Sequence, residues 1–405
     1  MKKLILLGLL LLFIGCPSAP KNAALIYISQ GEYTKAKQQI LVGLKETPDD
    51  FELYCVLAKA EIGLANWVAA TKAFESAFGI DSAKTINWML KDKDNVSVYW
   101  QTFYNSAYAL SSERKYTEAL NSLRFSKMIN PNDVNQYILE GAAYGELGNN
   151  EMANKSYIKA LSIDPQNPEA YFRIGKALFE IKQYDSSIVY FNDAIKHFEY
   201  RYTKVEKVLF QNLPSHDNAL HNEIIKLWSE KKETDLDQLI KVKLGFDGGL
   251  EAQKRNIENY FKTTDGLARS YYYLGMTYFN LKKNDLALNN LKKSLDLMPD
   301  DVDALYFIGL IQISMEKYQE AISYFEKLTQ IKIDDFDAWY YMGACYYLLK
   351  NYKKAIEVLE ENALRLNPES VEALKYLAQA YVIIGNEKKG REYQNKADLL
   401  EKEPR

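Results

Sequence analysis

The feature that most constrains this chain is a 34-residue stretch, residues 268–301, that reads as two short helices joined by a turn. Each half places small and apolar residues at i, i+3, i+4 and i+7, which is one face of a helix. A polar turn of Lys282, Lys283 and Asn284 separates the halves, and Pro299 ends the second one. A helix pair this short cannot bury its apolar face alone, so the pattern predicts copies of itself on either side.

The copies are found by following one small residue of the second helix, Ala287, along the chain. Two helices that cross closely need a small side chain at the crossing point. Six of the eight steps between such residues are 34 or 35 residues long, and the other two are 49 and 100. The spacing predicts nine helix–turn–helix units, whose small residues are Ala36, Ala70, Ala119, Ala153, Ser187, Ala287, Ala321, Ala355 and Gly390.

This pattern resembles the tetratricopeptide repeat (TPR) family, whose 34-residue unit has small residues at two such places and a proline near its end. The resemblance implies an all-α fold, a right-handed superhelical solenoid of about nine regular units plus a helical insertion. Units 1–2 are expected in residues 22–84, units 3–5 in residues 100–200, and units 6–9 in residues 268–405.

Two segments interrupt the 34-residue phase. Residues 85–99 form a short insertion that contains Trp88 and Met89, so it is expected to pack back on the repeats. Residues 201–267 are close to two repeat lengths and include a helical face of Leu220, Ile224 and Trp228. We expect a helical insertion or degenerate repeats that continue or cover the solenoid, and a protruding functional hairpin is the alternative.

The N-terminal residues 1–15 read as a signal peptide. Lys2 and Lys3 precede an apolar run, residues 4–14, that is too short to span a bilayer. The run ends in Phe-Ile-Gly-Cys16, which resembles the bacterial lipobox. That resemblance implies a lipid on Cys16, residues 16–21 as a tether, and a location at the bacterial cell envelope, on the periplasmic side of the outer membrane. An ordinary signal peptide or an uncleaved anchor is the alternative.

Several classes of function find no support in the sequence. The formal net charge is −3 with no basic block, which argues against a nucleic-acid surface. There is no glycine-rich phosphate loop, nucleophile elbow or cysteine pair. The three histidines, His197, His216 and His221, are predicted to be solvated surface residues, and Cys55 and Cys345 to be buried free thiols. We therefore expect no enzyme, no cofactor and no metal.

The expected site is a groove. In TPR proteins the inner wall comes from the first helix of each unit, and the equivalent positions here are strongly aromatic. The residues that the resemblance implies for a peptide-binding groove are Tyr104, Tyr108, Phe172, Lys176, Phe179, Tyr272, Phe279, Tyr306, Tyr340 and Tyr347. The alternative is that these rings pack on each other between units. Position 2 of most units is acidic or an amide, which disfavours the clamp that some family members use for a chaperone's C-terminal carboxylate.

The sequence therefore predicts a non-catalytic scaffold that is anchored to the membrane by a lipid and binds protein or peptide partners. It would assemble or assist complexes of the envelope. The alternative is a transporter-accessory periplasmic protein that binds a small hydrophobic or sugar ligand. A closed pocket among Phe172, Phe179, Tyr272 and Phe279 would favour that alternative.

Overall fold

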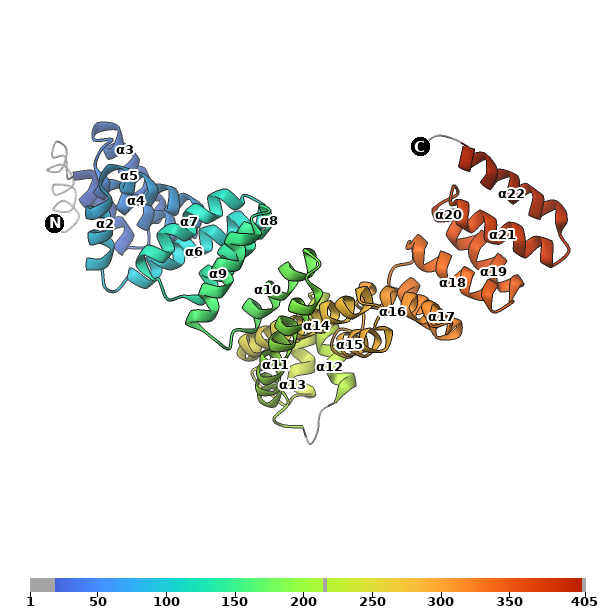
Figure 1. Ribbon diagram of the computed structural model, residues 1–405. Coiled ribbons are helices and arrows are strands. Elements are labelled where there is room, and N and C mark those ends of the chain that lie inside the picture. The colour runs from blue at the N-terminus through green and yellow to red at the C-terminus, as the bar shows by residue number, and fades with distance from the viewer. Residues whose placement is uncertain (1–18, 214–216, 403–405) are drawn as a thin grey trace. The chain divides into compact units, whose positions relative to one another are not determined.

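The structure is a computed structural model that describes residues 19–213 and 217–402. All regular elements in these two ranges are helices, and they form two compact units, Met1–Arg173 and Ile174–Arg405 (Figure 1). None of the described helices is long and apolar enough to cross a membrane. The predicted signal peptide and the lipid-bearing Cys16 lie outside the described residues, so lipidation stays a prediction.

The first unit consists of helix pairs in which each first helix is followed, after a short turn, by its partner. The pairs are α2 (Ala19–Ser29) with α3 (Tyr33–Glu46), α4 (Phe51–Gly63) with α5 (Trp67–Lys91), α6 (Val96–Ser112) with α7 (Tyr116–Ile129), and α8 (Val134–Glu146) with α9 (Asn150–Ile163). Helix α10 (Pro168–Glu180) contains the boundary between the units.

The small residues of the repeat lie where helices cross. Ala36 and Ala119 are fully buried. A Cβ placed on Gly141 of α8 would lie 2.4 Å from the Tyr157 ring of α9, so a larger side chain would push the pair apart. An aspartate caps the start of helix α4: the Asp50 side chain accepts the Glu52 backbone N–H at 2.9 Å. The 34-residue phase thus corresponds to packed helix pairs.

Two segments of the first unit differ from a regular repeat. Helix α5 is kinked at Asp81 (φ −151°, ψ 96°) and continues into residues 85–91. There Met89 is fully buried and Trp88 packs on Tyr99 at 5.7 Å between ring centroids. The segment therefore lies against the repeats. Ala19, Pro20 and Lys21, predicted as part of an extended tether, instead form the first turn of α2 because proline is tolerated there and Pro20 packs close to Gly43.

The second unit continues the pattern around a long insertion. Its helices after α10 are α11 (Tyr184–Leu209), α12 (Asn218–Ser229), α13 (Glu233–Val242), α14 (Gly249–Asn280), α15 (Asn284–Leu297), α16 (Val302–Ser314), α17 (Tyr318–Ile331), α18 (Phe336–Leu348), α19 (Tyr352–Val358), a π-helix (Leu359–Ala363), α20 (Leu364–Leu366), α21 (Val371–Ile383) and α22 (Glu387–Lys402). The π-helix lies in the one repeat that carries an extra residue, and this bulge absorbs it.

Residues 201–267 do not end where the sequence suggested. The expected boundary at residue 267 falls inside α14, a single helix of 32 residues that packs on α11 and then serves as the first helix of the next repeat. Gly266 makes this contact possible, since a Cβ there would lie 2.4 Å from the Phe198 ring. The extra residues form their own apolar core, which includes Leu209, Leu220, Ile224, Leu236, Ile240, Leu244, Ile257 and Tyr260.

The prediction for His221 is wrong. Its side chain is 2% exposed and lies in the core of the insertion. Nδ1 lies 2.5 Å from the Tyr260 hydroxyl, and Nε2 lies 3.1 Å from the Leu297 carbonyl oxygen at the end of α15. The histidine therefore joins the insertion to the repeat that follows. Spacing along the chain could not reveal these partners, because they lie 39 and 76 residues away.

Candidate functional site

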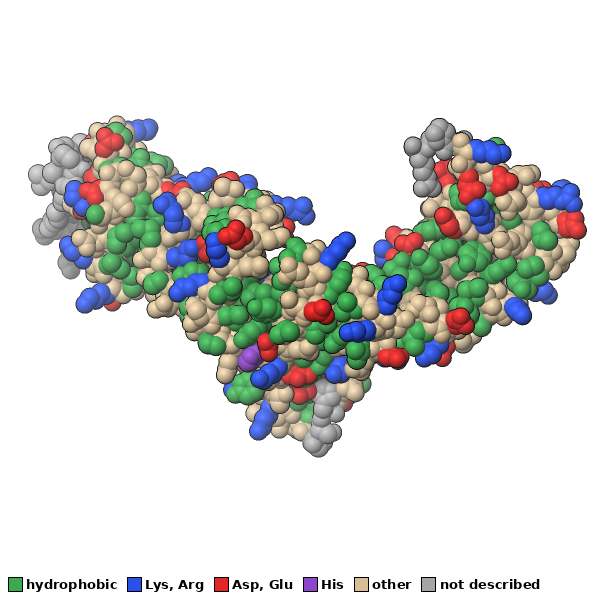
Figure 2. All heavy atoms as spheres, in the orientation of Figure 1, with side chains coloured by type: hydrophobic (Ala, Val, Ile, Leu, Met, Phe, Trp, Pro, Cys, Tyr) green, Lys and Arg blue, Asp and Glu red, His purple; other side chains and the backbone are tan. Residues whose placement is uncertain are grey.

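In the second unit, the first helices of successive repeats carry a continuous row of aromatic rings. Neighbouring ring centroids are 5.0–6.3 Å apart along the whole row, within the range of favourable ring pairs. We call this row the aromatic wall, and it consists of Tyr272, Tyr273, Tyr306, Phe307, Tyr340, Tyr341, Tyr376 and Tyr347. Figure 2 shows hydrophobic side chains gathered over α16, α18 and α21, which carry most of these rings.

Half of the wall was not predicted. Tyr273, Phe307, Tyr341 and Tyr376 each follow a groove position by one residue, and their rings link one repeat to the next. Phe307, for example, contacts Tyr306 of its own helix at 5.4 Å and Tyr272 of the preceding one at 6.3 Å. Their spacing of 34, 34 and 35 residues would have revealed them. The rings therefore do pack on each other between neighbouring repeats, which was the alternative to a groove. All eight rings nevertheless stay partly exposed.

The predicted groove residues divide by environment. Tyr108 is 61% exposed, whereas Phe172 is only 1% exposed, so the Phe172 ring is core and its assignment to a groove surface is corrected. The remaining ones are half-buried: Tyr104, Lys176, Phe179, Tyr272, Phe279, Tyr306, Tyr340 and Tyr347. The Lys176 ammonium lies 5.8 Å from the centroid of the Tyr273 ring, and Phe179 packs edge-on to the same ring at 5.6 Å. Phe279 extends the wall through Phe307 at 6.0 Å.

Two tyrosines of the wall, Tyr272 and Tyr340, are held neutral by their surroundings. Burial, with a contribution from Asp303 and Asp301, raises the pKa of Tyr272. Burial, with Tyr376, Tyr341, Glu372 and Asp337 nearby, raises the pKa of Tyr340 to about 12. Both causes disfavour the phenolate. The hydroxyls are therefore hydrogen-bond donors at neutral pH, and within the described ranges those of Tyr272 and Tyr340 have no hydrogen-bond partner.

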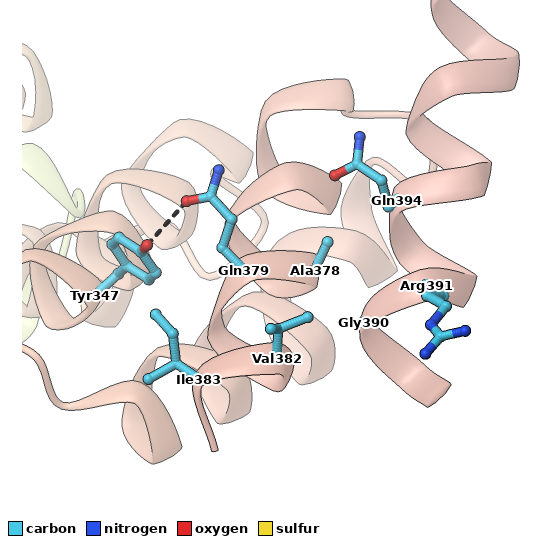
Figure 3. A pocket seen from close by; sticks show the side chains of 8 residues that line it. All are labelled: Tyr347, Ala378, Gln379, Val382, Ile383, Gly390, Arg391 and Gln394. Carbon is cyan, nitrogen blue, oxygen red and sulfur yellow. Dashed lines mark hydrogen bonds between the residues drawn. The ribbon is translucent and has the colours of Figure 1, made fainter. Parts of the chain in front are cut away.

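The wall ends in a cavity of about 370 Å³ at the C-terminal repeat. Tyr347 contributes the last ring, and its hydroxyl donates to Gln379 Oε1 at 2.8 Å (Figure 3). Val382 and Ile383 of α21 supply apolar surface and are about half exposed, and α22 adds Arg391. A mixed apolar and amide-lined cavity of this kind suits the end of a peptide or a side chain.

The metal-ligating and thiol side chains in the described part of the chain bear on catalytic chemistry. No group of three or more His, Cys, Asp or Glu side chains is arranged there to hold a metal ion. Cys55 and Cys345 are buried free thiols, as predicted. Burial raises the pKa of each to about 12, which opposes the reactive thiolate.

Three family models match the chain, over residues 141–199 and 256–397. A model described as "TPR repeat" matches residues 141–182, and one described as "Tetratricopeptide repeat" matches residues 169–199. A model described as "Anaphase-promoting complex, cyclosome, subunit 3" matches residues 256–328 and 321–397. The last match spans the helices that carry the aromatic wall.

Two plant proteins are similar in sequence. The Hsp70-Hsp90 organizing protein 3 of Arabidopsis thaliana is 24% identical over 200 residues, and the Hsp70-Hsp90 organizing protein of Triticum aestivum is 23% identical over 200 residues. Each match covers 44% of this chain, and the chain spans only 36% and 34% of the lengths of these relatives.

Two solved structures are also similar to this chain. YrrB, described as a TPR protein with an unusual peptide-binding site, is 19% identical and covers 62% of this chain and 95% of its own, with a TM-score of 0.41. PilF of Pseudomonas aeruginosa is 14% identical and covers 70% of this chain and 99% of its own, with a TM-score of 0.49.

Proposed function

Because this chain belongs to the tetratricopeptide-repeat family, we propose that it is a non-catalytic scaffold that binds protein or peptide partners through the aromatic wall. The observation that carries the proposal is the wall itself. Rings such as Tyr272, Tyr306 and Tyr340 recur at one position of consecutive repeats and remain partly exposed. Half-buried tyrosines bury much area on binding, lose little side-chain entropy, and have a hydroxyl to offer.

The geometry favours an elongated partner over a compact one. The wall crosses four helices, α14, α16, α18 and α21, and each repeat presents the same groups again. A small molecule would contact one or two repeats, whereas an extended or helical segment would contact several. The cavity beside Tyr347 then receives one end of that segment.

The names of the relatives support protein partners in general. Two of them are organizing proteins for the chaperones Hsp70 and Hsp90. The carboxylate clamp for such chaperones is disfavoured here, since the wall carries acidic side chains, Asp303, Asp337 and Glu372, at the second position of its repeats. We therefore propose a different partner for this chain.

The proposed place of work is the bacterial envelope, with the chain held by a lipid on Cys16. Support comes from the lipobox-like sequence and the short apolar run before it. Metabolic labelling with an alkyne fatty acid tests this. Label is expected on the full chain and absent from the Cys16→Ser variant, and equal membrane retention of both chains without label would refute the anchor.

Cross-linking in native membranes followed by mass spectrometry tests the binding function. The double variant Tyr272→Ala with Tyr306→Ala is expected to lose most of the captured protein. The matched control is Tyr200→Ala, which removes a ring that is 57% exposed on α11 and lies outside the wall. Equal capture by the native chain and the double variant, or no recovered protein at all, would refute the proposal.

The second candidate, a small hydrophobic or sugar ligand, has one supporting observation, the cavity beside Tyr347. Its residues differ from those that the sequence suggested for a closed pocket. If a small ligand were the natural one, Val382→Trp would abolish its binding and leave cross-linking to proteins unchanged.

A further inference from the structure

Resting on the proposed function, we infer that the partner segment is basic: an extended peptide whose lysine or arginine side chains pair with carboxylates set beside the aromatic wall. The carboxylates are Asp303 on α16, Asp337 on α18 and Glu372 on α21. Each is exposed and lies on the first helix of a repeat, next to the repeat that carries Tyr272, Tyr306 or Tyr340. The binding surface is the aromatic wall, as in the proposed function, and its occupant is a basic peptide.

Each repeat brings one tyrosine and one carboxylate together. Three pairs, Asp303 with Tyr306, Asp337 with Tyr340 and Glu372 with Tyr376, lie three or four residues apart on one helix and therefore share a helix face. Burial raises the pKa of the hydroxyls of Tyr272, Tyr306 and Tyr340 in the preceding repeat, and the same carboxylates lie near enough to raise it further. Their separation along the chain is 31, 31 and 32 residues, and the last is longer by the residue that the π-helix absorbs. The tyrosine face and the carboxylate therefore form one unit that is repeated three times.

Three cations near the wall form ion pairs with other carboxylates. Arg269 pairs with Asp265 at 2.8 Å, Lys332 with Asp335 at 2.9 Å, and Lys375 with Glu401 at 2.5 Å. Within the described ranges, Asp303, Asp337 and Glu372 have no ion pair. Lys332 lies near enough to Asp303 and Asp337, and Lys375 near enough to Glu372, to offset part of their negative charge, and the remainder is left for a partner.

The rings themselves accept cations. The Lys176 ammonium already lies over the Tyr273 ring, the first of the wall. For Tyr306 and Tyr340 the described residues supply no such cation. An ammonium or guanidinium that is held between a ring face and a carboxylate gains from both, which a neutral or acidic side chain cannot do.

The repeat spacing sets the spacing of the basic residues. Packed neighbouring helices lie about 10 Å apart. A segment in the extended polyproline-II conformation advances about 3.1 Å per residue and places every third side chain on the same face. One basic side chain in every three residues therefore meets one repeat after another. The matching peptide has the form Lys-x-x-Lys-x-x-Lys, with small neutral residues between.

Fluorescence anisotropy with labelled peptides and the full chain tests the inference. The probes are the Lys-x-x-Lys-x-x-Lys peptide, the same peptide with Gln or Glu in place of Lys, and one with the three lysines adjacent. The spaced lysine peptide is expected to bind roughly tenfold tighter than the glutamine peptide, since each exposed pair contributes modestly. Its affinity should fall when salt rises from about 0.05 M to about 0.5 M.

Two triple variants separate this surface from general charge attraction. Asp303→Asn, Asp337→Asn and Glu372→Gln together are expected to remove that tenfold preference. Asp285→Asn, Glu320→Gln and Glu392→Gln change the charge equally on the second helices of the repeats, where all three side chains are exposed, and should preserve it. Equal losses in both variants would overturn the inference.

The results also distinguish the preference for basic peptides from the proposed binding of peptides by the aromatic wall. If the glutamine peptide binds as tightly as the lysine peptide and Tyr272→Ala with Tyr306→Ala abolishes both, the wall binds peptides but the basic preference is wrong. If the adjacent-lysine peptide binds as tightly as the spaced one, the match to the repeats is wrong. If no peptide binds and no protein is cross-linked in membranes, the proposed function falls as well.

Discussion

His221 Nδ1 lies 2.5 Å from the hydroxyl of Tyr260, in the core of the insertion. The other ring nitrogen lies 3.1 Å from the Leu297 carbonyl, which can only accept, so Nε2 carries the proton. In the neutral ring Nδ1 is therefore the acceptor, and the Tyr260 hydroxyl donates to it. Tyr202 lies 3.3 Å beyond, hydroxyl to hydroxyl.

This arrangement predicts a cost for removing one hydroxyl. Tyr260→Phe keeps the ring but leaves a buried histidine nitrogen without its donor, and it is expected to lower the free energy of unfolding by about 1–3 kcal/mol. Tyr200→Phe is the control, because that tyrosine is 57% exposed. Urea unfolding followed by circular dichroism measures both. Equal stability of the two variants would show that the His221 contact contributes nothing.

Two glycines of α8 predict opposite effects of the same substitution. A Cβ on Gly141 would lie 2.4 Å from the Tyr157 ring, whereas one on Gly145 meets nothing within 4 Å. Gly145→Ala is expected to stabilise the chain by up to about 1 kcal/mol through helix propensity, and Gly141→Ala to destabilise it despite the same gain. Thermal unfolding decides, and a rise in Tm for both variants would contradict the close crossing.

The π-helix predicts that one residue can be deleted. Glu361 is exposed within the bulge, so its deletion should restore a regular helix and keep Leu359 and Ala363 in the core. Lys327 occupies the equivalent position of the preceding repeat, in the regular helix α17. Its deletion turns every later residue of that helix by about 100°.

The expected result is a small change in Tm for the Glu361 deletion and a large loss of stability for the Lys327 deletion. Differential scanning fluorimetry measures both. A Glu361 deletion as damaging as the Lys327 deletion would mean that the extra residue has a structural role of its own.

Cys55 and Cys345 are expected to react slowly with thiol reagents, because both are buried. Burial raises the pKa of Cys345 from 9.0 to about 12, and the thiolate is the reactive form. At pH 8 its thiolate fraction is therefore about a thousandfold lower than that of an unshifted thiol. Maleimide labelling followed by mass spectrometry should show Cys55 and Cys345 unmodified in the native chain and modified in urea. Rapid labelling of either in the native chain would contradict its burial.

Much of the fold and part of the site could be read from the residues alone. A 34-residue phase of small residues predicts helix pairs, since each pair crosses closely at a fixed point. Three rings of the wall, Tyr272, Tyr306 and Tyr340, were predicted because they recur with the 34-residue spacing. The burial of Phe172 could not be predicted in this way. Periodicity places a ring on one side of its helix, but it does not show whether neighbouring helices cover that ring.

The sequence alone determined the features that repeat every 34 residues. These are the regular helix pairs, their number, and the aromatic positions of the first helices that recur in phase. Only the tertiary structure decided the features that depend on contacts far apart in the chain. These are the continuity of α14 through the expected boundary at residue 267, the burial of His221 between Tyr260 and Leu297, and the approach of a carboxylate of the next repeat to Tyr272, Tyr306 and Tyr340. The physical reason is that local patterns record which side of a helix is apolar, whereas charge, burial and hydrogen bonding depend on what the neighbouring helices bring to that side.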